Sequence, residues 1–394
     1  MARGARAVWL LTGVLLGALA LAPHGARGGE RGPALIFAGD VMLDRVTKDA
    51  VFRRSLEIGR DRAYAEVFAD ARAVVGAADV AFANLETPIS SRLEPPPGPG
   101  EPPRFNAPIE LLESLGHAGF DVLSIANNHA YDQGMEGLDR TLSAARRVGL
   151  PVVGAGPDAG RAPGPVVFET AGGRIAFAAW TQGVNRRFGS HRRWVPRVAL
   201  AHDDSFESTL AAAREAAPLV VASLHWARRK SDGLGDAERA LLRRVAEAGA
   251  DVIVGHGLHV PGPIERLRTR DGRTVVAIHT LGNWLGAMRV SKGALQTPEL
   301  GVRDAPLVSV RTRASGDGRL EPAEVSVIPF WIASPRRPLP WWPGRQRAGA
   351  RPLSIRGELE RIARADCGRR CARRAQAYRK RMELQRVAMG AGME

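Results

Sequence analysis

Short, uninterrupted apolar runs recur along the chain, and most of them end in a polar residue. Strands that are buried on both faces of a parallel sheet have this pattern, so each run predicts such a strand. The predicted strands cover residues 34–38, 80–83, 122–126, 152–153, 175–180, 219–224, 251–255 and 274–278. Alternating runs over 308–313 and 324–330, on either side of a Gly-Asp-Gly turn, predict an antiparallel hairpin added to the sheet.

Helical segments lie between several of these strands. Helices are predicted over 64–76, 108–118, 137–148 and 236–248. Gly119 and Gly149 are the expected ends of the second and third helices, and Asp236 is a candidate cap for the fourth. Repeated strand and helix units predict βαβ architecture, in which the polar strand ends share one edge of the sheet.

The residues at the strand ends are carboxylates, amides and imidazoles. They are Asp40, Glu86, Asn127, Asn128, His129, His225, His256 and His259. In open α/β sheets ligands bind outside the carboxyl ends of strands. Asparagine is also a common turn residue, and an aspartate in this place can be a helix cap. Several buried imidazoles need polar partners, however, and this donor set suits Zn, Mn or Fe. The sequence therefore predicts a divalent metal site with one or two ions.

Charge and the N-terminal segment restrict the partners. The formal net charge is +15, and much of it lies between Arg336 and Arg386, which favours polyanions, membranes or nucleic acid. Residues 1–28 have the layout of a secretory signal peptide, with Arg3 and Arg6 before an apolar run over 8–22. That run is shorter than the roughly 20 residues of a spanning helix. We expect a periplasmic or secreted protein, with a retained N-terminal anchor as the alternative, and nucleic acid is disfavoured as a partner.

The C-terminal part differs in composition from the rest. A link over 335–352 is rich in Pro, Trp and Arg, and a basic helix is predicted over 354–388. Trp341 and Trp342 could contact a polymer or lipid surface, but packing of this tail on the main domain is the favoured reading. Cys367 and Cys371 predict either a weak local disulfide or two free thiols, not a metal site.

Six short motifs occur in order along the chain and carry a family resemblance. They are Gly39-Asp40-Val41-Met42, Asn84-Leu85-Glu86, residues 126–134, His225-Trp226, residues 255–259 and Leu281-Gly282-Asn283. Over residues 33–285 the chain resembles the bacterial capsule synthesis family of the CapA (poly-γ-glutamate capsule) type, which is similar to calcineurin-like metallophosphoesterases. The resemblance implies an α/β fold, a four-layer α/β/β/α sandwich, for a domain over 33–333.

The resemblance also implies roles for individual residues. Asp40 and His259 would hold a first metal, and Glu86 would bridge two metals. The second metal would be completed by Asn128, His225 and His256. His129 would be the general acid, and Asp132 would orient His129 or cap the next helix. The implied reaction is attack of a metal-activated water on a phosphoryl group or a similar electrophile.

Three positions depart from the metallophosphoesterase pattern. Met42 stands where those enzymes have a histidine ligand, so the first metal lacks one ligand. His256 and His259 have two residues between them instead of one. Residues 227–230, Ala-Arg-Arg-Lys, replace the glycine and acidic residue that often follow the histidine of relatives at the position of His225.

Two functions are compatible with these observations. The first is a secreted, metal-dependent hydrolase that acts on an anionic polymer or phosphorylated substrate. The second is a non-catalytic factor that binds or exports a capsule polymer, and a decayed site on a structural binder is a further form of it. Basic residues at 186–193 and 228–230 suit an acidic ligand in either case. Membrane-associated capsule machinery is the expected partner.

Overall fold

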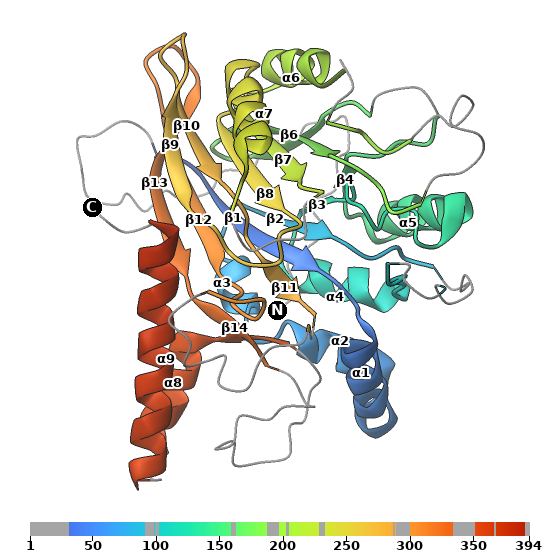
Figure 1. Cartoon of the computed structure of the whole chain (residues 1–394), viewed down its shortest axis with the longest axis vertical. Coiled ribbons are helices and arrows are strands. Elements are labelled where there is room, and N and C mark those ends of the chain that lie inside the picture. The colour runs from blue at the N-terminus through green and yellow to red at the C-terminus, as the bar shows by residue number, and fades with distance from the viewer. Residues whose placement is uncertain are drawn as a thin grey trace, which may run out of the picture.

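Two β-sheets form the framework of the protein (Figure 1). The structure is a computed structural model that describes residues 31–90, 98, 102–158, 163–186, 197–201, 205–227, 233–286, 288, 300–333, 351–365 and 368–390. The predicted signal peptide, most of the predicted link with Trp341 and Trp342, and Cys367 lie outside the described residues. The basic segments 187–193 and 228–230 lie outside them as well.

The first sheet has seven strands in the order β13-β12-β1-β2-β3-β4, with β11 paired to β1. The strands are β1 (Arg31–Val41), β2 (Val80–Leu85), β3 (Val122–Ser124), β4 (Val152–Val153), β11 (Asn283–Leu285), β12 (Leu307–Ala314) and β13 (Leu320–Ile328). Strands β1 to β4 and β11 are parallel, whereas β12 and β13 form an antiparallel hairpin on β1. The predicted hairpin is confirmed, although Phe330 begins a separate strand.

The second sheet has six strands in the order β5-β6-β7-β8-β10-β9. They are β5 (Val166–Thr170), β6 (Gly173–Thr181), β7 (Leu219–His225), β8 (Val252–His256), β9 (Ile264–Arg268) and β10 (Thr274–Ile278). The central four strands are parallel, and the edge strands β5 and β9 are antiparallel. The edge strands were not predicted, because they are only partly buried and lack the continuous apolar run of the central strands.

Alternate residues of the second sheet belong to two different cores. Val221 packs in the core between the sheets, together with residues of the first sheet such as Phe82. Its neighbours Val220 and Ala222 pack in the other core, under the helices of the far side. Phe82 and Phe177 stack across the interface with ring centroids 5.7 Å apart. Because successive strand residues point to opposite faces, each sheet is covered on both sides.

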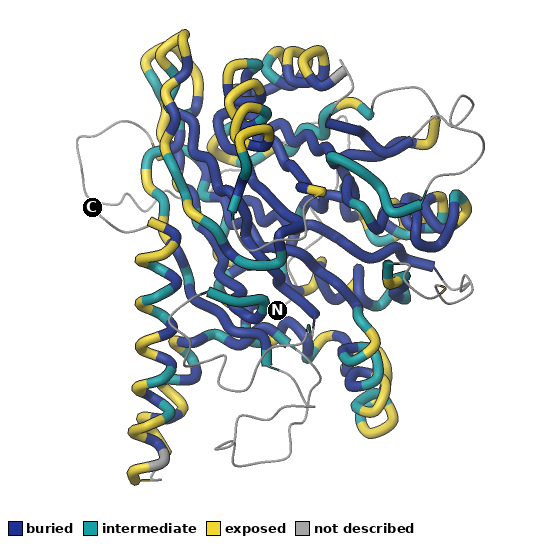
Figure 2. The backbone as a smooth tube through the Cα atoms, viewed as in Figure 1, coloured by how far each residue is buried: buried dark blue, intermediate teal, exposed yellow. Residues whose placement is uncertain are grey.

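Helices form the two outer layers. The first sheet is covered by α1 (Arg45–Ile58), α2 (Arg60–Val67), α3 (Arg72–Val75), α4 (Ile109–Ala118) and α5 (Gly134–Val148). The second sheet is covered by α6 (Ser205–Ala216) and α7 (Asp236–Glu247). Figure 2 shows the strands as the buried interior and the exposed residues on the outer sides of the helices. The predicted four-layer α/β/β/α sandwich is confirmed.

Two helix predictions need correction, and two predicted helix ends are confirmed. The segment 64–76 contains the end of α2, a turn and the short α3 instead of one helix. Gly119 and Gly149 end α4 and α5 in the left-handed conformation, with φ of 104° and 69°, as their place in the sequence predicts. Asp236 is the first helical residue of α7, and the cap is Gly235.

The C-terminal tail folds back onto the first sheet. Strands β14 (Phe330–Ala333) and β15 (Arg351–Ser354) pair, and α8 (Ile355–Arg364) and α9 (Gly368–Met389) follow. The prediction of one basic helix over 354–388 was therefore wrong. Gly368 has a φ of 52°, a left-handed conformation that is incompatible with one continuous helix. Cys371 is disulfide-bonded, which selects the disulfide over two free thiols.

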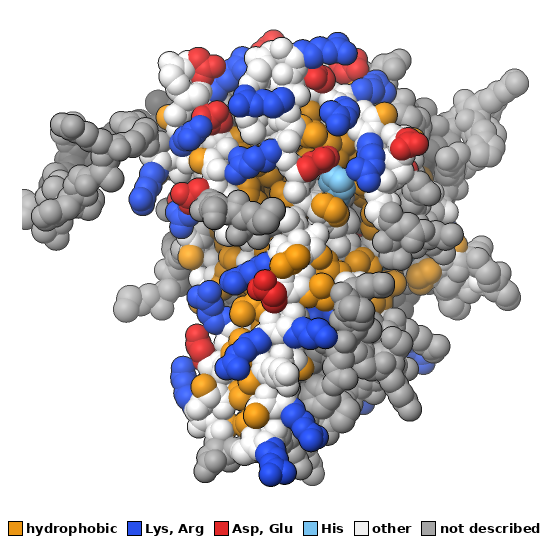
Figure 3. Space-filling view, turned by 60° about the vertical axis from the view of Figure 1, so that its left-hand side comes forward, with side chains coloured by type: hydrophobic (Ala, Val, Ile, Leu, Met, Phe, Trp, Pro, Cys, Tyr) orange, Lys and Arg blue, Asp and Glu red, His pale blue; other side chains and the backbone are white. Residues whose placement is uncertain are grey.

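Helix α9 lies beside β13 and has one buried and one basic side (Figure 1). Its buried residues recur every three or four positions, at Cys371, Ala375, Tyr378, Arg381, Gln385 and Met389. Arg369, Arg373, Arg379 and Lys380 are exposed. Lys and Arg side chains are spread over this face of the molecule, with acidic ones among them (Figure 3). Within the described residues, no helix has the length and apolar character needed to cross a membrane.

Candidate metal centre

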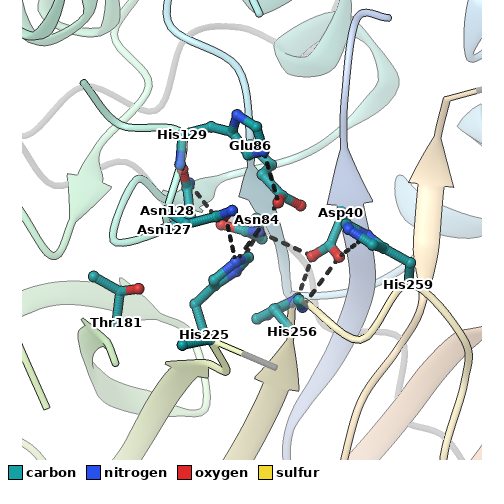
Figure 4. Close-up of polar contacts among 12 residues, drawn as sticks. Asp40, Asn84, Glu86, Asn127, Asn128, His129, Thr181, His225, His256 and His259 are labelled. Carbon is teal, nitrogen blue, oxygen red and sulfur yellow. Dashed lines mark hydrogen bonds and ion pairs between the residues drawn. The ribbon is translucent and has the colours of Figure 1, made fainter. Parts of the chain in front are cut away.

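The carboxyl ends of strands from both sheets meet at one point between the layers (Figure 4). In the first sheet, Asp40 at the end of β1 pairs with Asn84 of β2 on one side and Asn283 of β11 on the other. In the second sheet, His225 at the end of β7 pairs with His256 at the end of β8. The parallel strands therefore deliver their last residues to the same place.

Asp40 is completely buried and lies between polar groups of two segments, Asn84 of β2 and residues 256–259. Asn84 Nδ2 donates to its Oδ1 over 2.9 Å, and the Gly257 amide donates to its Oδ2 over 3.2 Å. His256 Nδ1 is 3.2 Å from Oδ1, and His259 Nδ1 is 3.4 Å from Oδ2. This arrangement stabilises the ionised carboxylate and leaves two imidazoles next to it.

Glu86 and His256 are the residues of this cluster whose side-chain polar atoms lack hydrogen bonds within the described residues. Both are completely buried, and neither Glu86 oxygen nor His256 ring nitrogen has a hydrogen-bond partner among the described residues. His225 Nε2 is 3.6 Å and His129 Nε2 is 3.9 Å from Glu86 Oε1. A buried polar group without a partner costs about 1–3 kcal/mol, and more when charged. These atoms fit a cation, which would supply the missing partner.

The donor set supports the same fit. Asp40, Glu86 and His259 each offer a ligand atom, and these atoms lie within 4.8 Å of one another. Carboxylate and imidazole are the common ligands of Zn, Mn and Fe. The site therefore has the donors for a divalent metal.

Asn128 and His225 approach each other from different sheets. Asn128 Oδ1 lies 2.9 Å from His225 Nε2, and His225 Nδ1 lies 3.3 Å from Asn84 Nδ2. The Asn128 amide group is held from behind, since its Nδ2 donates to Asn185 Oδ1 over 3.3 Å. The Asn185 backbone N–H also donates to the Asn128 carbonyl over 2.8 Å. Asn128 Oδ1 is thereby directed toward the cluster.

Asn127 fixes the turn that presents these residues. Its Nδ2 donates to Asn84 Oδ1 over 3.1 Å and to the Leu85 carbonyl over 2.9 Å. Its Oδ1 accepts from the backbone N–H of His129 over 3.1 Å. These bonds occupy the donor and acceptor groups of the Asn127 side chain, which agrees with the turn role expected of asparagine.

His129 lies at the edge of the cluster and is paired with Asp132. Its Nδ1 is 2.7 Å from Asp132 Oδ2, and its Nε2 faces Glu86. The Phe105 backbone N–H holds Asp132 Oδ2 over 2.6 Å, and the Phe105 ring packs on the imidazole with centroids 4.3 Å apart. Of the two roles considered for Asp132, orientation of His129 fits this geometry, because Gln133 is the N-cap position of α5.

Close backbone contacts require glycine at the strand ends. A Cβ at Gly39 would lie 2.0 Å from the Gly282 carbonyl oxygen, and one at Gly255 would lie 1.9 Å from the His279 carbonyl oxygen. Among the residues described, His259 is the one non-glycine residue with a positive φ, which is 62°. Non-glycine residues in this region are frequently held there for function. The conformation turns His259 back toward Asp40.

Burial and neighbouring charges perturb three of the ionisable groups. Burial raises the pKa of Glu86 well above its ordinary value, and nearby Asp40 adds to this effect. Burial alone would raise the pKa of Asp40, but the imidazoles of His256 and His259 outweigh it and hold the pKa well below its ordinary value. Burial lowers the pKa of His225 to about 3, against the opposing attraction of Asp40. His225 is therefore neutral, as a metal ligand must be.

Three asparagines of the site were not assigned roles from sequence. Asn84 and Asn283 belong to the motifs that carried the resemblance, so their place at strand ends was the available signal. Asn185 follows β6 without a comparable signal. Arg186, at the start of the basic loop, donates from Nη1 to the Asp132 carbonyl over 3.0 Å. Met42 is buried and has no nitrogen or oxygen in its side chain to offer a metal.

Two stacked sheets with outer helices, and this cluster at the strand ends, define an α/β/β/α sandwich protein with a candidate metal site between its sheets. The family model described as "Bacterial capsule synthesis protein PGA_cap" matches residues 34–287, and the chain belongs to this family. It is 27% identical over 292 residues to "PGA biosynthesis protein CapA" of Bacillus subtilis, covering 74% of this chain and 70% of the relative. It is 25% identical over 316 residues to "Capsule biosynthesis protein CapA" of Bacillus anthracis, covering 78% and 70%.

Among solved structures, the NAD nucleotidase NadN of Haemophilus influenzae aligns with a TM-score of 0.44 and 12% identity. The alignment covers 90% of this chain and 60% of that protein.

Proposed function

We propose that this protein is a metal-dependent hydrolase of the capsule synthesis family. It acts outside the cytoplasmic membrane on a phosphoester or related anionic bond during synthesis of a capsule or poly-γ-glutamate polymer. The observation that supports this proposal is the pair of completely buried side chains, Glu86 and His256, whose polar atoms make no hydrogen bond within the described residues where the two sheets meet. The names of the Bacillus relatives support the polymer context.

The proposed ligands divide between the two sides of Glu86. Asp40 and His259, whose ligand atoms lie near those of Glu86, would hold one ion. Asn128 and His225, which are 2.9 Å apart, would hold a second with Glu86 between the two. His256 lies within reach of this second group and is also 3.2 Å from Asp40. Mn, Zn or Fe suits these nitrogen and oxygen donors.

In the proposed mechanism, bound divalent ions lower the pKa of a water and stabilise developing negative charge. His129 supplies the proton for the leaving group from Nε2, the nitrogen that faces Glu86. Asp132 holds the opposite nitrogen over 2.7 Å and stabilises the protonated ring. Phe105 restricts the ring from the side, so the proton stays directed at the cluster.

An anionic substrate suits the surroundings of the site. Arg186 places a guanidinium beside the His129–Asp132 pair, at the start of the basic loop. The exposed side of α9 adds further positive charge to the surface. Positive charge raises the local concentration of an acidic polymer. An anionic polymer or phosphorylated substrate is therefore the proposed partner, together with membrane-associated capsule machinery.

A second candidate function is polymer binding or export without turnover. Met42 favours it, because a buried thioether occupies the position where the related enzymes have a metal ligand. A protein with one ion could bind an anionic polymer through that ion and the nearby arginines. Such a protein would contain metal but would not cleave a substrate.

Metal analysis and a phosphodiester assay test the two candidates together. We expect purified full-length protein to contain Mn, Zn or Fe and to cleave a chromogenic phosphodiester when Mn²⁺ or Zn²⁺ is added. Glu86→Gln and His225→Ala are expected to lose metal and activity, whereas His117→Ala, a histidine exposed on α4, keeps both. Metal without cleavage would select the binding function. Protein that takes up no metal would refute both candidate functions. Activity that survives loss of both His225 and His256 would refute the ligand assignment.

The proton role of His129 has its own test. We expect His129→Gln to keep its metal and to lose about 10²–10⁴-fold in turnover, the range of a general acid. Asp132→Asn should lose less, since the ring remains but its orientation and charge are less well held. An unchanged turnover in His129→Gln would remove this residue from the mechanism.

The location of the mature protein is the remaining part of the proposal. The predicted signal peptide over 1–28 supports export, and mass spectrometry of protein recovered from the envelope fraction tests it. Loss of the first 28 residues or a closely similar number would support cleavage. An intact N-terminus in the membrane fraction would support the retained anchor.

A further inference from the structure

The C-terminal helix α9 is connected to the candidate metal centre by a chain of buried polar contacts. Residues 300–390 lie beyond the part of the chain that the family model matches. The connection runs from α9 to a turn over residues 301–304, from this turn to Asn283, and from Asn283 to His259. The carbonyl and carboxylate oxygens in it can only accept, and this fixes the direction of each contact.

The first contact joins α9 to Asp304. Arg381 is 1% exposed and Asp304 is 0% exposed, and the guanidinium grips both carboxylate oxygens. Gln385 Nε2, one turn further along α9, donates to Asp304 Oδ1 over 2.7 Å. A planar guanidinium that binds two oxygens restricts both position and rotation of the carboxylate. Helix α9 therefore fixes Asp304.

The second contact joins Asp304 to the turn that contains Val302. The Gly301 backbone N–H donates to Asp304 Oδ2 over 2.8 Å, and the Asp304 N–H donates back to the Gly301 carbonyl over 2.9 Å. These bonds close the turn around Val302. The Val302 carbonyl then accepts from Asn283 Nδ2 over 2.9 Å.

The third contact joins Asn283 to His259. A carbonyl oxygen can only accept, so the bond to Val302 shows that the amide nitrogen of Asn283 faces the turn and its oxygen faces the centre. Asn283 Oδ1 lies 2.9 Å from His259 Nδ1. Because Oδ1 also can only accept, Nδ1 carries the proton. The lone pair of Nε2 is thereby left for an ion.

We propose that α9 sets the tautomer and ring orientation of His259 through Asp304, Val302 and Asn283. Asn283 is a positioning residue, and its loss loosens an imidazole that is already held at a φ of 62°. The inference rests on the proposed role of His259 as a metal ligand. It assigns to the C-terminal tail a function in metal retention, in addition to packing against the sheet. Outer contacts of this kind typically change metal affinity by about 10- to 100-fold.

Calorimetric titration of metal-free, full-length protein with Mn²⁺ tests the proposal. We expect Asn283→Ala to weaken Mn²⁺ binding about 10- to 100-fold. Arg381→Met should weaken Mn²⁺ binding by a smaller factor than Asn283→Ala. If α9 acts through Asn283, the double variant binds Mn²⁺ no more weakly than Asn283→Ala alone. The matched control is Arg374→Met, which removes another α9 arginine from a buried carboxylate, Glu358 of α8. Should Arg381→Met not fold, Arg381→Lys keeps the charge but loses the two-oxygen grip.

The proposal is overturned if Arg381→Met and Arg374→Met weaken Mn²⁺ binding equally, or if the losses in the double variant add. A second readout needs no metal. Side-chain ¹⁵N spectra of the metal-free protein should show His259 protonated at Nδ1, and Asn283→Ala should lose this fixed tautomer. A wild-type protein that binds no Mn²⁺ would refute the proposed function, whereas a His259 without the Nδ1 proton would refute this inference.

Discussion

At the scale of single residues, the centre contains completely buried carboxylate and imidazole atoms that make no hydrogen bond within the described residues. Asn127 and Asp132 are both satisfied by hydrogen bonds with named neighbours. Glu86 and His256 are as deeply buried, and within the part of the chain that the structure describes they make no hydrogen bond through these side chains. Burial of unpaired polar atoms lowers stability unless a ligand completes them. The pattern therefore separates residues that shape the site from residues that bind.

Glu86→Gln should reveal this difference as a change in stability. In metal-free protein burial raises the pKa of Glu86 and so favours its neutral form, which an amide of the same shape resembles, and Glu86→Gln should change the free energy of unfolding little. With Mn²⁺ at 100 times its Kd, the wild-type protein should gain about 2.7 kcal/mol, whereas Glu86→Gln should gain almost nothing. Thermal unfolding with and without Mn²⁺ measures both. An equal gain in the two proteins would contradict the proposed ligand role.

The depressed pKa of His225 predicts a pH dependence in metal-free protein. The folded-state pKa is about 3 and the ordinary value is 6.5, so between these values the unfolded chain binds a proton that the folded protein does not. Stability from this group is present above pH 6.5 and is lost as the pH falls, by about 1.4 kcal/mol per pH unit. His225→Gln lacks this loss. Denaturant unfolding at pH 7 and pH 5 should show wild type losing about 2 kcal/mol relative to the variant.

Two neighbouring carboxylates do not disturb this comparison. The pKa of Asp40 is depressed, so its contribution is lost only below its ordinary value of 3.8. The raised pKa of Glu86 means that protonation stabilises the fold as the pH falls, in wild type and variant alike. A difference between the two proteins that stays constant from pH 7 to pH 5 would show that His225 is not buried in its neutral form.

At the scale of elements, the site depends on how closely the strand ends approach each other. Strand β11 pairs with β1 for only two residues, and this pairing places Asn283 beside Asp40. The backbone at Gly39 has no space for a side chain, because the Gly282 carbonyl lies against it. One backbone contact thus includes Asn283, Asp40, Gly39 and Gly282.

Gly39→Ala and Gly116→Ala should change stability in opposite directions. The Cβ at Gly39 would lie 2.0 Å from the Gly282 carbonyl oxygen, and we expect a loss on the order of 3 kcal/mol. Gly116 is exposed in α4 with nothing within 4 Å of an added Cβ, and alanine there should gain about 0.5–1 kcal/mol. Chemical denaturation measures both variants. A Gly39→Ala protein as stable as wild type would show that β1 and β11 are less closely packed than described.

At the scale of the whole molecule, a buried ion pair attaches the tail to the sandwich. Arg381 also lies over the Trp331 ring, with its guanidinium carbon 5.3 Å from the ring centroid. Its partner Asp304 belongs to the turn that leads into β12. Such a pair gives little net stability compared with apolar packing, but removal of one partner leaves a buried charge. The tail is thereby held in a single docked arrangement.

Arg381→Met should cost about 3–5 kcal/mol of unfolding free energy, because Asp304 then remains buried without its cation. Adding Asp304→Asn should recover more than half of this loss, since no unpaired charge is left. Denaturant unfolding of the two variants and of Asp304→Asn alone completes the comparison. Losses that simply add in the double variant would show that the two residues are not coupled.

Much of the candidate site could be predicted from the sequence, because apolar runs that end in Asp40, Glu86, His225 and His256 mark parallel strands and their ends. The four-layer fold followed from the resemblance that these motifs carry. The edge strands of the second sheet, α1 and α6 were not predicted, since partly buried or weakly amphipathic segments lack a strong periodic signal.

Sequence alone determined which residue types stand at the strand ends, because that depends on local periodicity. Tertiary structure decided what surrounds them. Only the stacking of two sheets brings His225 to Asn128 and buries Glu86 and His256 with polar atoms that make no hydrogen bond among the residues described. Only the return of α9, nearly 80 residues after Asp304, places Arg381 against that carboxylate. Contacts between distant segments depend on how whole elements pack, and no local pattern contains that information.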